Sequence, residues 1–285
     1  MSSYETASGR INVIDTLSEN PNGDALLCIH GFPCDARIFG YAASKLSKAG
    51  YDVYSMDLPG HGKSDGKKGD LDFDICLTSI NQIVTELKKK SKRVFILAHS
   101  MGSIFALWYA HRFPNSINGL ILLAPYIRVR GVKRSDAEPT TTTFLKLLIG
   151  RLFFPNKRVN LAKVSPGFIQ IGGSQIARMT LDKELNFDYT YRYFVDIIAS
   201  RNNKIGVLKD ITVPVLILHG SKDRNVYPQV SEKFFKLLRT ENKEIRVFDC
   251  NHWFYDAIFF SQTSEYSEQD RLQVISSIVE WLGKF

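Results

Sequence analysis

The chain of 285 residues is 44% hydrophobic and 23% charged, which allows a sizeable folded core and excludes wholesale disorder. No apolar run approaches the roughly 18 residues of a membrane span, and the polar N-terminus, Met1 to Gly9, lacks the apolar stretch of a signal peptide. The four cysteines are too scattered for a disulfide framework or a zinc site. We therefore expect a cytoplasmic protein that uses neither a metal nor a cofactor.

The net charge of +8 is concentrated in one part of the chain. Residues 126–210 hold 15 Lys and Arg against 7 Asp and Glu, whereas the remainder holds 22 of each. Such a segment favours an anionic substrate or membrane surface, although a solvated surface is the simpler interpretation. Nucleic acid is not an expected partner, because no recognised binding motif accompanies the charge.

In chain order, an edge strand over Arg10–Leu17 precedes six short apolar runs that are typical of strands buried on both faces. These runs are Ala25–His30, Asp52–Met56, Arg93–Ala98, Gly119–Ala124, Val213–His219 and Glu244–Asp249. Amphipathic patterns predict five helices, over Ala36–Ala49, Leu77–Lys90, Gly102–Arg112, Gln229–Arg239 and Asp270–Leu282. The alternation predicts an α/β fold with a mostly parallel sheet and helices on both faces.

The alternation of strands and helices stops after Pro125 and resumes at Val213. The residues between are basic, aromatic and mostly helix-like, with breaks at Thr140–Thr143 and Ile171–Ser174. The simplest interpretation is an insertion between two strands of a single sheet. The chain then divides into a core of residues 1–125 and 211–285 and an inserted segment of residues 126–210.

The strongest chemical signal is Ala98-His99-Ser100-Met101-Gly102, which follows a predicted strand and precedes a predicted helix. Small residues two positions before and after the serine permit the sharp turn of a nucleophile elbow, G-x-S-x-G, although Ala98 replaces the first glycine. The turn would hold the Ser100 hydroxyl at the carboxyl edge of the sheet. A rival motif, Asp57–Ser64, lacks the spacing of a phosphate loop and indicates a structural turn.

A serine hydroxyl needs a base to take its proton. His252 follows the last predicted strand, in a loop that returns over the carboxyl edge above Ser100, and it is our candidate. Structural or packing roles are expected for the other histidines, which lie beside glycines, at strand ends or within a helix: His30, His61, His99, His111 and His219.

The base in turn needs a carboxylate to orient it. Asp223 follows the strand Val213–His219 and is the candidate, with a helix N-cap as its alternative role. Asp249 and Asp256 are rivals because they are close to His252 in sequence. The backbone N–H groups of Phe32 and Met101 are the predicted donors to a developing oxyanion, since Pro33 has no N–H.

Together these residues resemble the α/β-hydrolase superfamily, and more narrowly its monoacylglycerol lipase and lysophospholipase-like branch of serine hydrolases. The resemblance extends from Leu26 to His252 and rests on His30-Gly31-Phe32, Asp57 with Gly60–Ser64, His99–Gly102, Pro214–Leu216, Gly220–Asp223 and His252. It implies an α/β-hydrolase fold with Ser100 as nucleophile, Asp223 as acid, His252 as base and residues 126–210 as a cap. Ser103 departs from the branch, which often has another glycine there.

These observations predict a carboxylic ester hydrolase that acts through an acyl-enzyme on Ser100, with monoacylglycerols, lysophospholipids or other small acyl esters as substrates. Hydrolysis of a thioester, lactone, peptide or carbon–carbon bond stays open, as does a non-catalytic ligand-binding role. The apolar run Phe144–Pro155 could line an acyl-chain tunnel or pack on the core. It could equally make peripheral contact with a membrane, with Lys146 and Arg151 at the headgroups.

Overall fold

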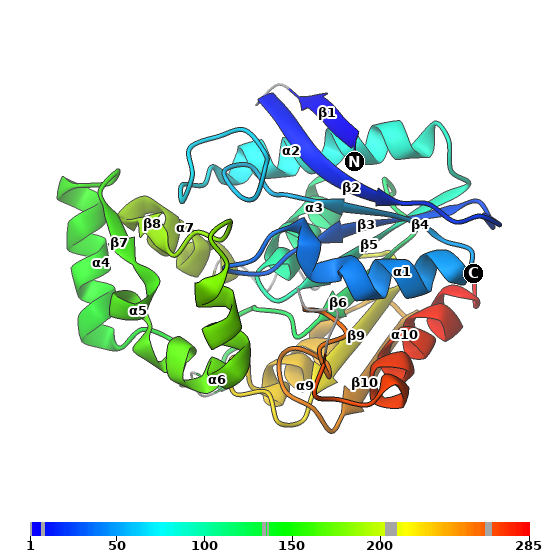
Figure 1. The fold of residues 1–285 in the computed structure, drawn as a ribbon. Coiled ribbons are helices and arrows are strands. Elements are labelled where there is room, and N and C mark those ends of the chain that lie inside the picture. Colours follow the sequence, from blue (N-terminus) through cyan, green and yellow to red (C-terminus); the bar gives the residue numbers. More distant parts are fainter. Residues whose placement is uncertain (1, 7–8, 133–134, 136, 203–209, 260–263) are drawn as a thin grey trace.

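The computed structural model describes residues 2–6, 9–132, 135, 137–202, 210–259 and 264–285. Its centre is an eight-stranded sheet with the strand order β1-β2-β4-β3-β5-β6-β9-β10 (Figure 1). Six strands are parallel and match the predicted apolar runs within two residues: β3 (Asp24–Ile29), β4 (Asp52–Met56), β5 (Arg93–His99), β6 (Gly119–Leu123), β9 (Val215–Gly220) and β10 (Lys243–Phe248). Every residue of β3, β6 and β9 is buried, which explains their lack of polar alternation.

Two antiparallel strands extend one edge of the sheet. β2 (Gly9–Thr16) pairs with β4 and coincides with the predicted edge strand. β1 (Ser2–Thr6) pairs with β2, and the sequence analysis does not predict it because the segment is polar. An edge strand can keep one face in solvent, and in β1 the half-buried positions alternate with the exposed Ser3 and Glu5.

Helices cover both faces of the sheet (Figure 1). One face carries α1 (Gly40–Lys48) and α10 (Glu268–Leu282), and the other carries α2 (Phe73–Lys88), α3 (Gly102–Arg112) and α9 (Pro228–Leu237). The first predicted helix is divided, because Ala36–Phe39 forms a separate 3-10 turn, η1. α2 begins earlier than predicted, since the side chain of Asp72 caps it by accepting a hydrogen bond from the Ile75 N–H.

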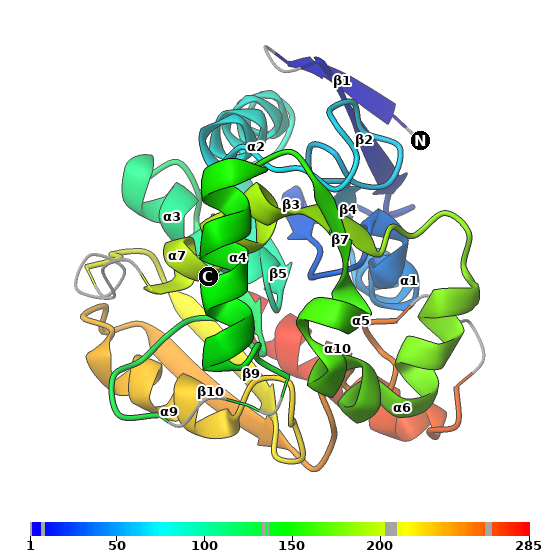
Figure 2. The same cartoon turned by 90° about the vertical axis from the view of Figure 1, so that its left-hand side faces the viewer.

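The chain between β6 and β9 forms a separate layer of helices. It contains α4 (Thr141–Phe153), β7 (Arg158–Asn160), α5 (Leu161–Val164), α6 (Pro166–Leu181), β8 (Asp188–Thr190) and α7 (Tyr191–Asn202). β7 and β8 form a small antiparallel sheet of their own. Figure 2 views this layer from the front, with α4 and α7 beside each other and α5 and α6 to their lower right.

The two breaks predicted in this segment have different outcomes. The expectation for Thr140–Thr143 is wrong, because the Thr140 hydroxyl caps α4 and the next three threonines form its first turn. The expectation for Ile171–Ser174 is confirmed as a kink inside α6, at Gly173 with φ 50° and ψ −130°. Glycine adopts this left-handed backbone without the steric cost that a side chain would bring.

Polar contacts attach the inserted layer to the rest of the molecule. The carboxylate of Asp70, in the loop before α2, accepts hydrogen bonds from the Thr190 hydroxyl at 2.9 Å and from the Arg192 Nε at 3.1 Å. On the opposite side, Arg37 of η1 lies 3.0 Å from Asp182. Within the described residues, no helix is both long and apolar enough to cross a bilayer.

Candidate active site

Ser100 occupies the turn that joins β5 to α3. Its φ of +50° is unusual for a residue other than glycine, and neighbouring strands hold it. The Ser100 N–H donates to the Leu123 carbonyl at 2.8 Å, and the Ser100 carbonyl accepts from the Tyr126 N–H at 3.1 Å. A Cβ on Gly102 would lie 2.3 Å from the Ile29 carbonyl oxygen, so the helix can approach the sheet only with glycine there. The local geometry is that of a nucleophile elbow.

Two positions where the sequence departs from the expected motif fit this turn. Ala98 is fully buried within β5, between its partners Ile29 and Leu122, and has room for its methyl group. The buried hydroxyl of Ser103 donates to the Ala98 carbonyl at 3.3 Å. The second hydroxyl of this segment is therefore used within the turn itself.

His252 and Asp223 come together at the same edge of the sheet. The His252 Nδ1 lies 2.6 Å from the Asp223 Oδ2, and both residues are buried. Because a carboxylate accepts, the Nδ1 carries the hydrogen, which leaves Nε2 as the nitrogen that can take a proton. This is the tautomer that a serine hydroxyl requires of its base.

Asp223 receives two more kinds of support. Its Oδ1 accepts from the backbone N–H groups of Asn225 and Val226 at 2.8 and 2.9 Å, and its Oδ2 lies 3.3 Å from the His219 Nε2. Burial alone would raise the pKa of this carboxyl, but the neighbouring His252 and His219 outweigh burial and lower the pKa. His219 lies four residues before Asp223 in the sequence, but its support of this carboxylate was not predicted.

The two rival carboxylates face other partners. Asp249 is exposed and lies 2.8 Å from the Lys222 ammonium group. Asp256 is fully buried but points toward the inserted layer, where its carboxylate accepts from Arg178 at 3.2 Å and from Gln175 at 3.4 Å. Asp223 is thus the candidate carboxylate that contacts His252.

The remaining histidines have contacts of a structural kind. The Nε2 of His30 accepts from the Leu58 N–H at 3.1 Å, and His219 donates to the Val226 carbonyl at 2.8 Å. His99 donates from Nε2 to the backbone carbonyl of His252 at 3.1 Å and so supports the loop that carries the candidate base. Burial, reinforced by the charge of His252, lowers the pKa of His99 to about 3. His111 is exposed on α3.

The segment Asp57–Ser64 forms the structural turn that the sequence predicts. The Asp57 carboxylate accepts from the backbone N–H groups of Ala36 and Lys63, both at 2.7 Å, and the Ser64 hydroxyl donates back to the Asp57 carbonyl. His61 in this turn contacts the hydroxyl of Tyr193 from α7 at 3.2 Å. The turn therefore contacts α7 of the inserted layer and supports it.

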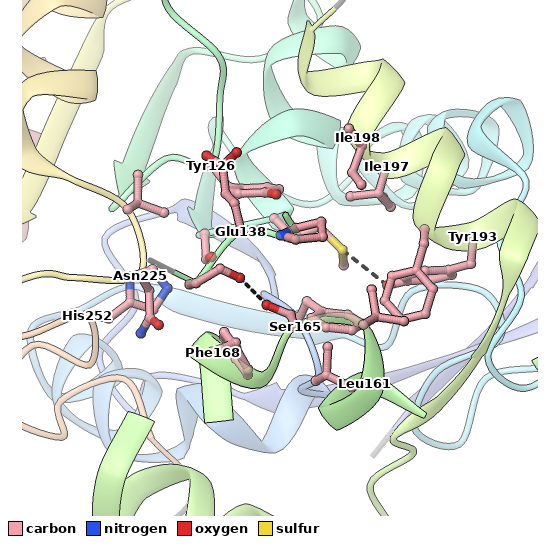
Figure 3. Close-up of a pocket in the computed structure, with 18 residues that line it drawn as sticks. Tyr126, Glu138, Leu161, Ser165, Phe168, Tyr193, Ile197, Ile198, Asn225 and His252 are labelled. Atoms are coloured by element: carbon pink, nitrogen blue, oxygen red, sulfur yellow. Dashed lines mark hydrogen bonds between the residues drawn. The ribbon is translucent and has the colours of Figure 1, made fainter. Parts of the chain in front are cut away.

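A cavity of about 90 Å³ lies between Ser100, His252 and the inserted layer (Figure 3). Phe32 and Met101, the residues of the predicted oxyanion donors, both line it. Its other walls are largely apolar and come mainly from α5, α6 and α7: Leu161, Val164, Phe168, Tyr193, Phe194, Ile197 and Ile198. Tyr193 also donates a hydrogen bond to the Met101 sulfur at 3.2 Å, a contact that sequence reasoning could not supply.

The run Phe144–Pro155 does not line this cavity, so the tunnel that the sequence suggested is not formed by it. Leu147 and Gly150 face the protein, whereas most of the large apolar side chains of α4 are exposed. Among the described residues, no group of three or more His, Cys, Asp or Glu is arranged to hold a metal ion.

Comparisons with known proteins agree with this architecture. A family model described as serine aminopeptidase, S33, matches residues 20–252. A monoglyceride lipase homolog of Monkeypox virus is 27% identical over 73% of each chain, and the monoglyceride lipase of Homo sapiens is 23% identical over 69% of this chain and 64% of its own. The structure of a Saccharomyces cerevisiae monoglyceride lipase variant, in complex with a substrate analog, superimposes with a TM-score of 0.81 at 21% identity, covering 99% of this chain and 94% of that one.

The family model covers most of the chain. The chain therefore belongs to the serine aminopeptidase, S33, family of hydrolases and has the α/β-hydrolase fold, and it is similar to monoglyceride lipases over about 70% of its length.

Proposed function

We propose that this hydrolase cleaves carboxylic esters of lipid-like acyl groups through an acyl-enzyme on Ser100. The observation that carries the proposal is the bond from the His252 Nδ1 to the Asp223 Oδ2 at the wall of a cavity that Ser100 also lines. The apolar wall of the cavity favours an acyl chain over a peptide. We propose further that residues 126–210 act as the cap over this site, since they supply most of the apolar wall.

Acylation begins when the Ser100 Oγ attacks the ester carbonyl carbon and its proton passes to the His252 Nε2. The carbonyl oxygen becomes an oxyanion, which the N–H groups of Phe32 and Met101 stabilise at the N-terminus of α3. Asp223 stabilises the imidazolium that forms. His252 then gives its proton to the alcohol oxygen, and the bond from this oxygen to the carbonyl carbon breaks.

Deacylation repeats these steps with water in place of serine. His252 takes a proton from the water, the resulting hydroxide attacks the acyl carbon, and the second oxyanion uses the same two N–H donors. The proton then returns to the Ser100 Oγ as the carboxylic acid leaves. The net reaction adds one water across the ester bond and regenerates the enzyme.

Replacement of Ser100 by Ala tests the proposal. We expect hydrolysis of p-nitrophenyl and monoacylglycerol esters to fall by about 10³-fold or more, with an unchanged circular dichroism spectrum. A fluorophosphonate probe should label the unmodified protein and not the variant. Ser116→Ala, beyond the far end of α3, is the matched control. Unchanged turnover in the Ser100 variant would contradict the proposal.

A panel of substrates separates the alternative bonds. The proposal requires acylglycerols to be hydrolysed faster than acyl-CoA thioesters, lactones and aminoacyl amides of comparable size. Faster cleavage of an amide or a thioester would leave Ser100 as nucleophile and replace the ester as the substrate class. Absence of probe labelling together with absence of turnover would favour a ligand-binding role.

We also propose that α4 makes peripheral contact with an anionic lipid surface. Six large apolar side chains of α4 and the residue that follows it are exposed: Leu145, Leu148, Ile149, Leu152, Phe153 and Phe154. The exposed Lys146, within α4, and Lys157, shortly after it, add positive charge to this segment. Arg151, the other cation suggested for the headgroups, already lies 2.7 Å from Asp196. The combination of an apolar helix face with cations fits a bilayer that carries negative charge.

Sedimentation with vesicles tests this contact. We expect the protein to pellet with phosphatidylserine-containing vesicles at low salt and less at high salt, because salt screens the attraction of the lysines. The double variant Leu152→Gln and Phe153→Gln should abolish pelleting, whereas Leu17→Gln, at an exposed position on the core, should not. Failure to pellet at either salt concentration would refute the proposal.

A further inference from the structure

One tyrosine of the inserted layer contacts the side chains of both residues that carry the proposed oxyanion donors. Tyr193 lies in the first turn of α7, is 1% exposed and lines the cavity that Ser100 also lines. Its hydroxyl lies 3.2 Å from the Met101 sulfur, and its ring centroid lies 5.7 Å from that of Phe32 (Figure 3). Met101 and Phe32 belong to different segments of the core, so a single residue of α7 joins them.

The hydrogen of the Tyr193 hydroxyl lies between two acceptors. The His61 Nδ1 lies 3.2 Å from the Pro59 carbonyl, which can only accept, so this nitrogen carries the ring hydrogen and Nε2 is an acceptor. The Tyr193 hydroxyl lies 3.2 Å from that Nε2 and 3.2 Å from the Met101 sulfur. The end of the Tyr193 ring is therefore fixed between the turn Asp57–Ser64 and the start of α3.

The ring of Phe32 is enclosed by aromatic side chains of the inserted layer. Four ring centroids lie 4.6 to 6.2 Å from its own, and they belong to α6, β8 and α7: Phe168, Tyr189, Tyr193 and Phe194. Aromatic pairs at these separations have preferred orientations. The four rings therefore restrict the side chain of Phe32 and, through its Cα, the direction of its backbone N–H.

The strength of an oxyanion site depends on how well its donors are held in place. N–H groups that already point at the position of the oxyanion stabilise it without reorganisation during the reaction. A small displacement of such donors affects the transition state more than the bound substrate, because the charge on the oxygen develops only in the transition state. Loss of a residue that holds the donors should therefore lower kcat and leave KM nearly unchanged.

We propose that Tyr193 is a positioning residue for the oxyanion hole, the site formed by the N–H groups of Phe32 and Met101. Its ring acts on Phe32 and its hydroxyl acts on Met101. The inserted layer thereby contributes to the rate of the reaction as well as to the apolar wall of the cavity. This inference rests on the proposed ester hydrolysis.

Tyr193→Phe tests the hydroxyl, because it keeps the ring against Phe32. We expect kcat for a p-nitrophenyl ester to fall by about tenfold, while KM changes by less than about twofold. Met101→Leu removes the sulfur, keeps the N–H and should cause a similar fall. The double variant should be no slower than the slower single variant, because both changes remove the same contact.

Tyr189→Phe is the matched control. It removes a second hydroxyl from the same ring cluster, since the Tyr189 and Tyr193 ring centroids are 4.5 Å apart. The Tyr189 hydroxyl donates to the Asn186 carbonyl at 2.6 Å, within the inserted layer, and does not contact the core. This variant should keep kcat within about twofold of the unmodified enzyme.

Two ketones of equal length separate positioning of the donors from support of the cavity. The Ser100 Oγ adds to the carbonyl carbon of trifluoromethyl octyl ketone, its proton passes to the His252 Nε2, and the carbonyl electrons move to the oxygen, which becomes an oxyanion. Methyl octyl ketone fits the same cavity, but its carbonyl is far less electrophilic. Tyr193→Phe should raise the inhibition constant of the trifluoromethyl ketone by about tenfold, in parallel with the fall in kcat, and should leave that of the methyl ketone unchanged.

Equal weakening of both ketones, a rise in KM with kcat unchanged, or additive losses in the double variant would overturn this inference alone. If the Tyr193 variant does not fold, Met101→Leu with the same two ketones decides the question. An unmodified protein that neither hydrolyses the ester nor binds the trifluoromethyl ketone more tightly than the methyl ketone would overturn the proposed ester hydrolysis, and this inference with it.

Discussion

The Nδ1 of His252 lies 2.6 Å from the Oδ2 of Asp223, although the two residues are 29 positions apart in the chain. The same carboxylate oxygen lies 3.3 Å from the Nε2 of His219, so one buried oxygen faces two imidazole rings. The His252 ring carries its hydrogen toward that oxygen, since a carboxylate can only accept, whereas the nearer acceptor for the His219 Nε2 is the Val226 carbonyl at 2.8 Å. The orientation of His252 therefore depends on Asp223 remaining an acceptor.

Replacement of Asp223 by Asn should lower kcat by about 10³- to 10⁴-fold, because an amide N–H that donates to the His252 Nδ1 favours the tautomer that cannot take the Ser100 proton. The measurement is steady-state hydrolysis of a p-nitrophenyl ester. Asp249→Asn is the matched control, since Asp249 is exposed and pairs with Lys222. Equal rates for the Asp223 variant and the control would remove Asp223 from the proposed mechanism.

Replacement of Arg178 by Met should destabilise the protein strongly. Asp256 is fully buried, and loss of the guanidinium 3.2 Å away leaves its carboxylate with Gln175 and Ser264 alone. Removal of one partner of a buried ion pair costs about 3 kcal/mol or more of unfolding free energy. The value is read from urea denaturation at neutral pH.

The control for this prediction is Arg112→Met. Arg112 contacts Asp74 with both side chains exposed, and exposed ion pairs contribute at most about 1 kcal/mol. If both variants lost the same small amount of stability, the Arg178–Asp256 contact would be of no structural importance.

Acid should destabilise the fold well above the pH at which carboxylates are protonated. Burial, with repulsion from His30 and Lys68, lowers the pKa of His61 to about 3, from an ordinary value of 6.5. Between these two values the unfolded chain binds a proton that the folded chain does not. Stability is therefore complete above pH 6.5 and is lost as the pH falls toward 3.

His61→Asn tests this dependence, because an amide can replace the hydrogen bonds to Pro59 and Tyr193 but does not titrate. The unfolding free energy of the unmodified protein should fall by about 2 kcal/mol for each such histidine between pH 7 and pH 5. The variant should lose about 2 kcal/mol less over the same interval, measured by urea denaturation. Identical losses in the two proteins would show that His61 is not responsible.

The parallel strands and the elbow could be predicted because their signals are local. The run Gly119–Leu123 is apolar throughout, and the small residues around Ser100 fit only a sharp turn. The polar strand Ser2–Thr6 could not be predicted, since its pairing with β2 is a tertiary contact. The start of α4 was missed because threonines that suggest a loop also cap helices.

Some features of the candidate site could likewise be predicted from the sequence, and others could not. Ser100, Asp223 and His252 each follow a strand, so topology alone places them at one edge of the sheet. The contacts of Tyr193 with Met101 and His61 depend on how α7 packs over the core. This packing could not be predicted from the pattern of hydrophobic residues in the sequence.

Two glycine-to-alanine replacements should act in opposite directions. A Cβ on Gly102 would lie 2.3 Å from the Ile29 carbonyl and 2.7 Å from the His30 carbonyl, so α3 would have to move away from the sheet and carry Ser100 with it. Gly40, at the start of α1, has helical φ and ψ values and nothing within 4 Å of an added Cβ. Gly102→Ala should therefore cost roughly 3 kcal/mol of stability and most of the proposed activity, whereas Gly40→Ala should gain up to about 1 kcal/mol of stability because alanine restricts the unfolded chain. Thermal unfolding and p-nitrophenyl ester hydrolysis measure both effects, and an active Gly102 variant of normal stability would contradict the tight approach of α3 to β3.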